Sequence, residues 1–461
     1  MPLLARFDSK RWCQASCGVA IGLYGIIYLG LIVNVRADNP IVVGQGLTDP
    51  KVRIYGDRAY LYATHDSSPE SKYWRMYDWW TWSSDDLVHW KYESTLKPEE
   101  TYWGKPCNSC WATEGISHNG KYYFYFSRGN NELGVVEGAT PVGPWTDPLH
   151  KPFVAAGSVP TPARDPAILQ EKDGTTYVVF GCWDYYLARL NDDMITLAEK
   201  PRKLVLDQKM GPYGPGKTDD KPFLHEYNGK YYLSWGCFYA MSDNIHGPYT
   251  YKGSIITEEN TAPEFRKALV FDRHGSFFEL HHQWYFACND QSWPGTTKFF
   301  RDSIIDYVHY KDNGEIAPLY INQTGVGQYD AGQPRIEAED YFNAEGVTQK
   351  ECPEGGFELR DIRDGSWAGY PNVMNLSTNA VISFRIAAVG PHDSTIEVHE
   401  DAVNGPLLGS VHVPGAGKGT SYETISTRLS NGGGKENIYL VFHGRTGELL
   451  KLDWFSFKNP K

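Results

Sequence analysis

The sequence contains no run of lysine and arginine, and its 461 residues carry a formal net charge of -12. Proteins that bind nucleic acid normally present a basic face to the phosphate backbone. The chain also lacks a second cysteine or histidine pair to match Cys107 and Cys110, and a structural zinc site needs four such ligands. These absences exclude a nucleic-acid partner and argue against zinc. The two cysteines are expected to form either a local disulfide or two buried thiols.

Hydrophobic residues make up 41% of the chain and charged residues 22%, a composition typical of a folded protein with a buried core. Aromatic content is high, at 14%, with 31 tyrosines and 15 tryptophans. Aromatic rings offer a flat apolar face and a polar edge, which suits stacking against sugars, but β-strands also favour aromatic residues. Composition by itself therefore leaves sugar binding and a β-rich fold as two explanations.

The amino-terminal segment 1–37 differs from the rest of the chain. Basic residues precede an apolar stretch over residues 19–35, and Ala37 ends a segment with small residues where a signal peptidase cleaves. The stretch is long for a signal peptide and short for a membrane span. We expect cleavage near Ala37 and a secreted protein. The alternative is an uncleaved anchor that tethers the protein to a membrane.

A weak repeat recurs five times within residues 38–325. Each copy has a polar residue, a short apolar strand, a turn and an aromatic strand, and the polar residues lie at positions 49, 114, 165, 220 and 274. Spacings of 51 to 65 residues suit one four-stranded blade per repeat. Turn signals such as Asn119-Gly120 and Asn228-Gly229 lie between the strands. The repeat predicts an all-β fold with a five-bladed β-propeller.

The residues that lead the five copies are expected to converge at the propeller axis. They are Asp49, Glu114, Asp165, Asp220 and His274. A single Asp-Pro pair usually does no more than cap a strand or turn. Several carboxyl groups crowded at one place repel one another, so they persist mainly where catalysis or a cation uses them. Four acids and a histidine in register with one repeat therefore favour a functional site.

At these residues the sequence resembles glycoside hydrolase family 43, over residues 39–320. The resemblance rests on the Asp-Pro opening, the Trp-Ala-x-acid second copy, the Asp-Pro-x-Ile third copy and the His-Gly-Ser fifth copy, with SSDDLVHW (83–90) and GPYTYKG (247–253) between them. It implies a five-bladed propeller with a general-base Asp, an Asp that tunes the pKa of the acid, and a general-acid Glu. It implies no cofactor for catalysis.

The resemblance implies that Asp49 is the general base and Asp165 the residue that tunes the pKa of the acid. It places His274 beneath the sugar. The sequence departs from the family at the acid, because Asp220 replaces the usual Glu and is one methylene shorter. An inverting enzyme separates its base and acid by about 6.5–9.5 Å, so that a water fits between the base and the sugar. Glu114 and Glu279 are other carboxyls, but neither falls on the acid position.

Residues that contact substrate are less well marked. Trp111 precedes a channel acid and Trp183 follows an inner strand, so both are candidates, together with Glu114 and His274. Large aromatic residues between blades belong more often to the hydrophobic core than to a sugar-binding surface. In relatives the substrates are mostly β-xylosides and α-L-arabinofuranosides, and sometimes galactans.

The carboxyl-terminal part, residues 334–461, follows a Gly-rich link over 326–333. Alternating strands and Gly- or Asn-rich turns predict a jelly-roll β-sandwich. This part resembles carbohydrate-binding module family 6, through IEAED near its start, DGSWAGYPNV (364–373) and LDWFSF near its end. The resemblance implies a structural Ca²⁺ held by early acids and a late Asp, which here would be Glu337, Glu339 and Asp453. Of the aromatic residues that the resemblance implies for a sugar-binding cleft, only Tyr422 remains as a ring on which a sugar could stack. Sugar binding and a purely structural role of this domain therefore both stay open.

The sequence therefore predicts a glycosidase that hydrolyses O-glycosidic bonds of plant-type polysaccharides with inversion. An α-L-arabinofuranosidase or β-xylosidase is expected, with galactan as a further possible substrate. The alternative is a glycan-binding propeller that has lost its activity with the catalytic Glu. No protein partner is implied.

Overall fold

The computed structural model describes residues 39–460 apart from 71, 416–417 and 431–432. In this part of the chain regular structure is almost entirely β-strand, with two short helical turns, η1 (Pro98–Glu100) and η2 (Pro263–Phe265). The all-β class is confirmed. No helix among the described residues is long and apolar enough to cross a membrane. The expected leader 1–37 lies outside the described residues.

Within the described residues, strands β1 to β19 form five consecutive antiparallel sheets. The first contains β1 (Leu47–Tyr55), β2 (Arg58–His65), β3 (Trp79–Ser84) and β4 (Lys91–Leu96). The second contains β5 (Cys110–His118), β6 (Lys121–Arg128), β7 (Glu132–Gly138) and β8 (Trp145–Thr146). The third contains β9 (Ala167–Gln170), β10 (Thr176–Cys182), β11 (Asp184–Arg189) and β12 (Arg202–Lys203). The fourth contains β13 (Pro222–Tyr227), β14 (Lys230–Trp235), β15 (Phe238–Ser242) and β16 (Thr250–Ser254), and the fifth β17 (Gly275–Leu280), β18 (Gln283–Asp290) and β19 (Asp302–Val308).

The turns between the first two strands of the second and fourth sheets form as the sequence predicts. Asn119-Gly120 joins β5 to β6 and Asn228-Gly229 joins β13 to β14, and all four residues have positive φ. Asn-Gly favours this conformation because glycine carries no Cβ and asparagine tolerates left-handed backbone. Each turn sets the register of the hairpin that it joins.

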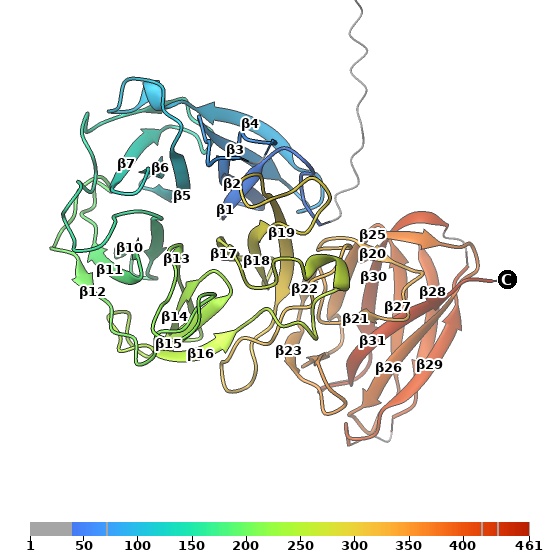
Figure 1. Cartoon of the computed structure of the whole chain (residues 1–461). Helices are drawn as coiled ribbons and strands as arrows, with labels where there is room; N and C mark the ends of the chain where they lie inside the picture. The colour runs from blue at the N-terminus through green and yellow to red at the C-terminus, as the bar shows by residue number, and fades with distance from the viewer. Residues whose placement is uncertain (1–38, 71, 416–417, 431–432, 461) are drawn as a thin grey trace, which may run out of the picture. The chain divides into compact units, whose positions relative to one another are not determined.

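The five sheets form a closed ring. The first strands of the sheets, β1, β5, β9, β13 and β17, each contact the next, and β17 contacts β1. Figure 1 shows the sheets arranged around a common centre. The segment just before β1 helps to close the ring, because the Asn39 side-chain amide donates to Ile305 O at 3.0 Å and the Ile41 N–H donates to Ser303 O at 2.9 Å.

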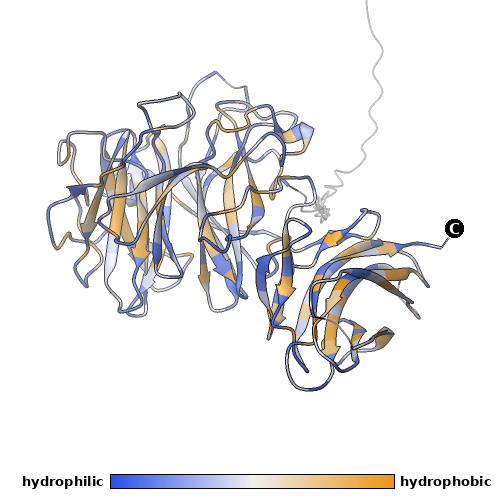
Figure 2. Ribbon diagram, turned by 90° about the horizontal axis from the view of Figure 1, so that it is seen from below, coloured by the Kyte–Doolittle hydropathy of each residue, from blue (hydrophilic) through white to orange (hydrophobic). Residues whose placement is uncertain are grey.

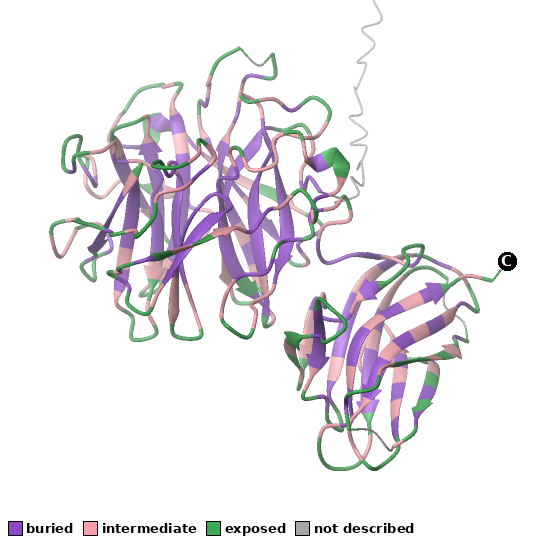
Figure 3. Cartoon of the chain, turned by 60° about the horizontal axis from the view of Figure 1, so that its bottom comes forward, coloured by how far each residue is buried: buried purple, intermediate pink, exposed green. Residues whose placement is uncertain are grey.

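Hydrophobic cores lie between neighbouring sheets. One cluster joins side chains of the third, fourth and fifth sheets, including Trp235, Phe223 and Phe286. A second joins the first sheet to the fifth. In Figure 3 the strands of this region are mostly buried while the loops that connect them are exposed. Many of the aromatic residues counted in the sequence therefore lie in the hydrophobic core. A β-rich fold thus explains part of the high aromatic content.

In the described residues, strands β20 to β31 form two further sheets. One contains β20 (Tyr329–Asp330), β22 (Asn343–Glu345), β25 (Trp367–Leu376), β27 (Ser394–Glu400), β28 (Leu407–Val413) and β30 (Gly434–His443). The other contains β21 (Ile336–Glu337), β23 (Thr348–Glu351), β24 (Phe357–Arg360), β26 (Val381–Ala388), β29 (Glu423–Arg428) and β31 (Leu450–Lys458).

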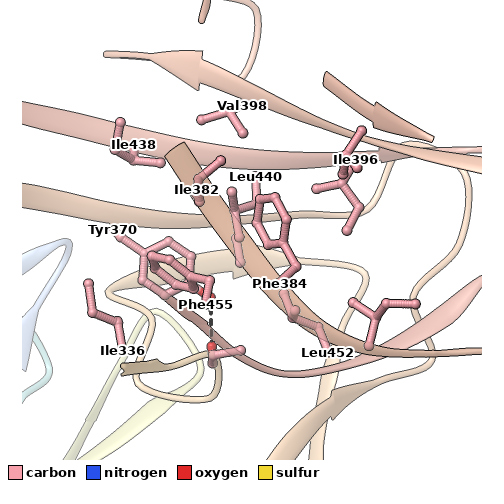
Figure 4. Packing of buried hydrophobic residues seen from close by; sticks show 14 of the residues in the cluster. Ile336, Tyr370, Ile382, Phe384, Ile396, Val398, Ile438, Leu440, Leu452 and Phe455 are labelled. Atoms are coloured by element: carbon pink, nitrogen blue, oxygen red, sulfur yellow. Dashed lines mark hydrogen bonds between the residues drawn. The ribbon is translucent and has the colours of Figure 1, made fainter. Parts of the chain in front are cut away.

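These two sheets pack face to face as a β-sandwich. Figure 4 shows the core between them, where Phe384 and Phe455 of one sheet meet Tyr370 and Leu440 of the other. Alternate residues of β26 and β27 are buried, and Figure 2 shows the same alternation of hydrophobic and hydrophilic residues along the strands. The predicted link 326–333 contains a strand of this domain, because β20 pairs in parallel with β25.

Candidate active site

Three residues in equivalent positions share an unusual backbone conformation at the starts of the first, third and fourth sheets. Asp49, Asp165 and Lys221 have φ values of 50°, 57° and 61°, and each stands directly before a proline. Positive φ is uncommon outside glycine and costs conformational energy. The residue of the fourth sheet that corresponds to Asp49 is therefore Lys221. This corrects the sequence repeat, which placed Asp220 in that position.

Acidic and basic side chains from these strand starts and from nearby loops form one connected group, which we call the central cluster. Its members are Asp49, Arg164, Asp165, Asp219, Asp220, Lys221, Asp272 and Arg301. Strand starts converge because the first strands of the five sheets form a ring. Of the five residues that the sequence predicts to converge, Asp49, Asp165 and Asp220 belong to this cluster, and His274 lies 3.2 Å from Asp49.

Asp49 is held in its ionised form. Its Oδ1 accepts hydrogen bonds from Asn289 Nδ2 at 2.8 Å and from Arg301 Nη1 at 3.0 Å, and His274 Nδ1 lies 3.2 Å from the same oxygen. Burial alone would raise the pKa of Asp49, but Arg301 and His274 outweigh it and hold the pKa well below its usual range. Oδ2 accepts no hydrogen bond from the described residues. One oxygen of this carboxylate is therefore left without a hydrogen-bond donor among the described residues.

Arg301 connects three carboxylates. Its Nη1 lies 3.0 Å from both Asp49 and Asp272, while Nε contacts Asp66 at 2.8 Å. Trp74 covers the guanidinium, with the ring centroid 4.7 Å from its central carbon. Burial raises the pKa of Asp66 to about 6 despite this contact. The arginine thus orients Asp49 and links the first sheet to the loop before the fifth.

Asp165 is buried and ties the third sheet to the fourth. Its N–H donates to Ser127 Oγ at 2.9 Å, and its Oδ2 accepts the Lys221 N–H at 2.8 Å. Burial raises the pKa of Asp165, and the negative charge of Asp220 raises it further. A carboxyl with these contacts can influence the ionisation of Asp220 without reaching solvent itself.

Asp220 lies between two cations. Arg164 Nη2 lies 2.7 Å from its Oδ2, and Lys221 Nζ lies 2.5 Å from its Oδ1. Burial alone would raise the pKa of Asp220, but these two cations lower it far below the usual range. Its side chain keeps 26% of its surface exposed, against 7% for Asp219, so Asp220 is the member of the pair that a ligand can reach.

Asp219 is the neighbouring carboxyl. Lys221 Nζ lies 2.8 Å from its Oδ2, and the Asp220 N–H donates to its Oδ1 at 3.0 Å. Burial raises the pKa of Asp219 to about 6, against the attraction of Lys221. Two carboxyls this close titrate together, and the first proton taken up belongs to the pair.

Glu114 lies elsewhere than expected. Its side chain is completely buried, pairs with Arg53 Nη2 at 2.8 Å and accepts the Ile168 N–H at 3.2 Å. It stands in the middle of β5 and not at the start of an inner strand, as Asp49 and Asp165 do. The expectation that Glu114 contacts substrate is therefore wrong for this arrangement, because a fully buried, paired carboxylate presents nothing to a ligand.

The other predicted site residues have mixed surroundings. His274 is buried against Asp49, and its Nε2 has no hydrogen-bond partner among the described residues. Trp111 lies beside the central cluster, with the Arg164 guanidinium 5.8 Å from its ring centroid. Trp183 is 38% exposed, and its N–H donates to Asp219 O at 3.0 Å. All three lie next to members of the central cluster.

A model of glycosyl hydrolases family 43 matches residues 37–316 of this chain. The chain belongs to glycosyl hydrolase family 43. It is a glycosidase that hydrolyses O-glycosyl compounds. A model of carbohydrate-binding module family 6 matches residues 337–459, which correspond to the β-sandwich.

Several relatives of this family 43 protein cover most of its length. An arabinoxylan arabinofuranohydrolase of Paenibacillus polymyxa is 28% identical over 91% of this chain and 74% of its own. One of Bacillus subtilis (strain 168) is 25% identical, over 96% of each chain. A xylosidase/arabinosidase of Bacteroides ovatus is 28% identical over 60% of this chain and 96% of its own.

Solved structures of the family resemble the fold. A Bacillus subtilis arabinoxylan arabinofuranohydrolase in complex with cellotetraose has a TM-score of 0.54, at 22% identity, over 92% of this chain and 97% of that chain. A family 43 enzyme of Xanthomonas citri complexed with xylose has a TM-score of 0.51, at 25% identity, over 63% of this chain and 94% of that chain.

In the carbohydrate-binding-module domain, the three predicted calcium ligands are buried or half-buried carboxyls. Burial raises the pKa of Glu337 to about 7 and of Asp453 to about 6, and it raises that of Glu339 well above its usual range. Glu337 is paired with Arg335 at 2.6 Å, whereas Glu339 Oε2 is buried without a partner among the described residues. No three His, Cys, Asp or Glu side chains in the described part are arranged to hold a metal ion.

A cavity of about 690 Å³ lies apart from the central cluster of the family 43 domain. Its lining includes Asp306, Tyr320 and Glu339 but no member of the cluster. The residues that the sequence predicts as catalytic, Asp49, Asp165 and Asp220, therefore do not line this cavity.

Sequence reasoning missed five charged residues of the central cluster, namely Arg164, Asp219, Lys221, Asp272 and Arg301. Arg164, Asp219 and Lys221 adjoin predicted site residues in the chain, so their position beside Asp165 and Asp220 could have indicated them. Asp272 and Arg301 lie in loops outside the repeat. No local pattern marks them.

Proposed function

We propose that this protein is an inverting α-L-arabinofuranosidase that removes arabinofuranosyl side groups from a xylan chain. Two relatives that match nearly the whole chain carry the name arabinoxylan arabinofuranohydrolase, which supports the choice of substrate. The observation that carries the chemistry is the ionised Asp49, whose Oδ2 is left free. The five sheets would then be the blades of a five-bladed propeller.

In this mechanism the bond from the anomeric carbon to the leaving oxygen breaks while a water forms a new bond on the opposite face. Asp49 Oδ2 takes the proton of that water, and its low pKa keeps it ionised over the working range. Arg301 and Asn289 hold Oδ1, so the carboxylate keeps one orientation. Inversion follows because water attacks directly, without a covalent intermediate.

The proton for the leaving oxygen comes from the Asp219–Asp220 pair. Asp220 is the exposed member, and Asp219 has a pKa raised to about 6. Below that pH the pair carries a proton, which Asp220 delivers to the departing oxygen. Lys221 and Arg164 oppose the transfer of the proton to Asp220, because both favour its charged form.

A panel of aryl glycosides tests this function. The full chain is expected to hydrolyse an aryl α-L-arabinofuranoside faster than an aryl β-D-xyloside or an aryl galactoside. NMR of the first sugar released should show the anomer opposite to that of the substrate. Retention of configuration would contradict the proposed water attack.

One observation favours a second candidate, a glycan-binding protein without activity. Asp220 lies between two cations that favour its charged form, which opposes its use as a general acid. If no panel sugar and no arabinoxylan is hydrolysed at any pH between 4 and 8 while the protein still binds xylan, this second candidate is correct. A polysaccharide ligand also fits the secretion expected from residues 1–37, which lie outside the described residues.

We also propose a structural Ca²⁺ in the β-sandwich, held by Glu339 and Asp453 of the three predicted ligands, because Glu337 is paired with Arg335. The unpartnered, buried Glu339 Oε2 supports it, because an uncompensated buried carboxylate is costly and a cation removes that cost. Added Ca²⁺ is expected to raise the unfolding temperature of the sandwich, and a chelator to lower it. In Glu339→Gln both effects should shrink. If calcium and the chelator leave the unfolding of the unaltered protein unchanged, no ion is bound there.

A further inference from the structure

Three exposed aromatic side chains form a row beside the central cluster. Trp183, Tyr213 and Phe271 are 38%, 58% and 50% exposed. The rings of Trp183 and Tyr213 lie 5.5 Å apart at 61°, and those of Tyr213 and Phe271 lie 6.3 Å apart at 66°. We call these three residues the aromatic row.

Each member of the aromatic row lies in a different segment of the chain, close to Asp219 or Asp272 of the central cluster. Trp183 lies at the tip between β10 and β11 and donates its N–H to Asp219 O. Tyr213 lies in the loop before β13, and burial together with the charge of Asp219 raises its pKa. Phe271 directly precedes Asp272, which contacts Arg301 at 3.0 Å.

The row has no structural task in the core. None of its members belongs to a hydrophobic cluster of the described residues. Exposed apolar surface is unfavourable in water, and contiguous exposed rings mark a binding surface more often than isolated ones do. The mutual edge contacts hold the rings in place before any ligand arrives, which lowers the entropy lost on binding.

The geometry points to a single soluble polysaccharide chain as the ligand of the aromatic row. We infer that the row binds the main chain of the polymer whose side group is cleaved at the central cluster. Sugar rings stack on aromatic faces through their apolar C–H surfaces. Rings tilted by 61° and 66° cannot lie on one flat crystalline surface, but they can contact successive sugars of a chain that turns along its length. This inference rests on the proposed arabinofuranosidase function.

The row predicts a substrate effect that separates polymer from small glycoside. An aryl arabinofuranoside carries no main chain, so it does not reach the row. In Tyr213→Ala and in the double variant Tyr213→Ala/Phe271→Ala, kcat/KM on soluble arabinoxylan is expected to fall by about fivefold and about thirtyfold. Turnover of the aryl arabinofuranoside should stay within about twofold.

Two matched variants control for general effects. Tyr213→Phe keeps the ring and should behave as the unaltered protein. Tyr92→Ala removes a ring of similar exposure, 46%, on strand β4 away from the row, and should change neither substrate. If the polymer and aryl activities of Tyr213→Ala fall together, or if polymer activity does not fall, the inference is wrong.

Binding provides a readout that does not need activity. Retardation of the protein in a gel containing soluble xylan should be weaker for the double variant than for the unaltered protein and for Tyr92→Ala. If the protein hydrolyses nothing but this difference is present, the proposed function fails and the aromatic row stands. If equal retardation accompanies an active enzyme, the row is overturned while the function stands. If the double variant loses binding to crystalline cellulose but not to soluble xylan, the ligand of the aromatic row is not a single soluble chain.

Discussion

Asp49→Asn is expected to lower kcat on an aryl α-L-arabinofuranoside by about 10²–10⁴-fold, the range that a general base contributes. Asparagine matches the shape of aspartate and can still accept a hydrogen bond from Arg301 or Asn289 at its oxygen. It cannot take a proton from water. The loss should therefore appear in kcat, with KM changed much less.

A small anionic nucleophile checks the assignment of the base. Azide needs no proton removed, so it should restore turnover in Asp49→Asn and yield a glycosyl azide of inverted configuration. The unaltered enzyme should gain nothing from azide. Circular dichroism and the urea unfolding midpoint of the variant should match those of the unaltered protein. If Asp49→Asn keeps full activity, another group activates the water.

Lys221→Met is expected to move the alkaline limb of the pH profile of kcat/KM upward by about 1–3 pH units, the range typical of a nearby opposite charge. The acid of the reaction must be protonated. Lys221 contacts Asp219 at 2.8 Å and Asp220 at 2.5 Å and favours the charged form of both. Without it, protonation becomes easier, the pKa of the pair rises, and the enzyme stays active to higher pH.

The unaltered enzyme should accordingly lose activity above about pH 6, where the carboxyl pair loses its proton. Lys221→Arg keeps the charge and should keep this limb. Lys209→Met removes a nearby lysine that pairs with Asp184 outside the central cluster, and its profile should also be unchanged. If the alkaline limb does not move in Lys221→Met, the Asp219–Asp220 pair is not the general acid.

Much of the fold could be predicted because its signals are local or repeated. The hairpin turns at Asn119-Gly120 and Asn228-Gly229 depend on two residues each. The five sheets follow from one pattern repeated at similar spacing, and Asp49, Asp165 and Asp220 meet because the strand starts form a ring. The same reasoning placed Glu114 at the site and failed, because that residue stands in the middle of β5 and pairs with Arg53 inside the domain.

By itself, the sequence determined the all-β class, the five sheets with a sandwich after them, and three aspartates that share the central cluster. Only the tertiary structure decided how those aspartates are charged. Arg301 is 252 residues from Asp49 in the chain but donates a hydrogen bond to it. In the fourth sheet the position equivalent to Asp49 is occupied by Lys221 and not by the expected aspartate. The physical reason is that pKa values depend on burial and on charges brought close in space. Neither the burial of a carboxyl nor a charge brought close by folding can be predicted from a local pattern in the chain.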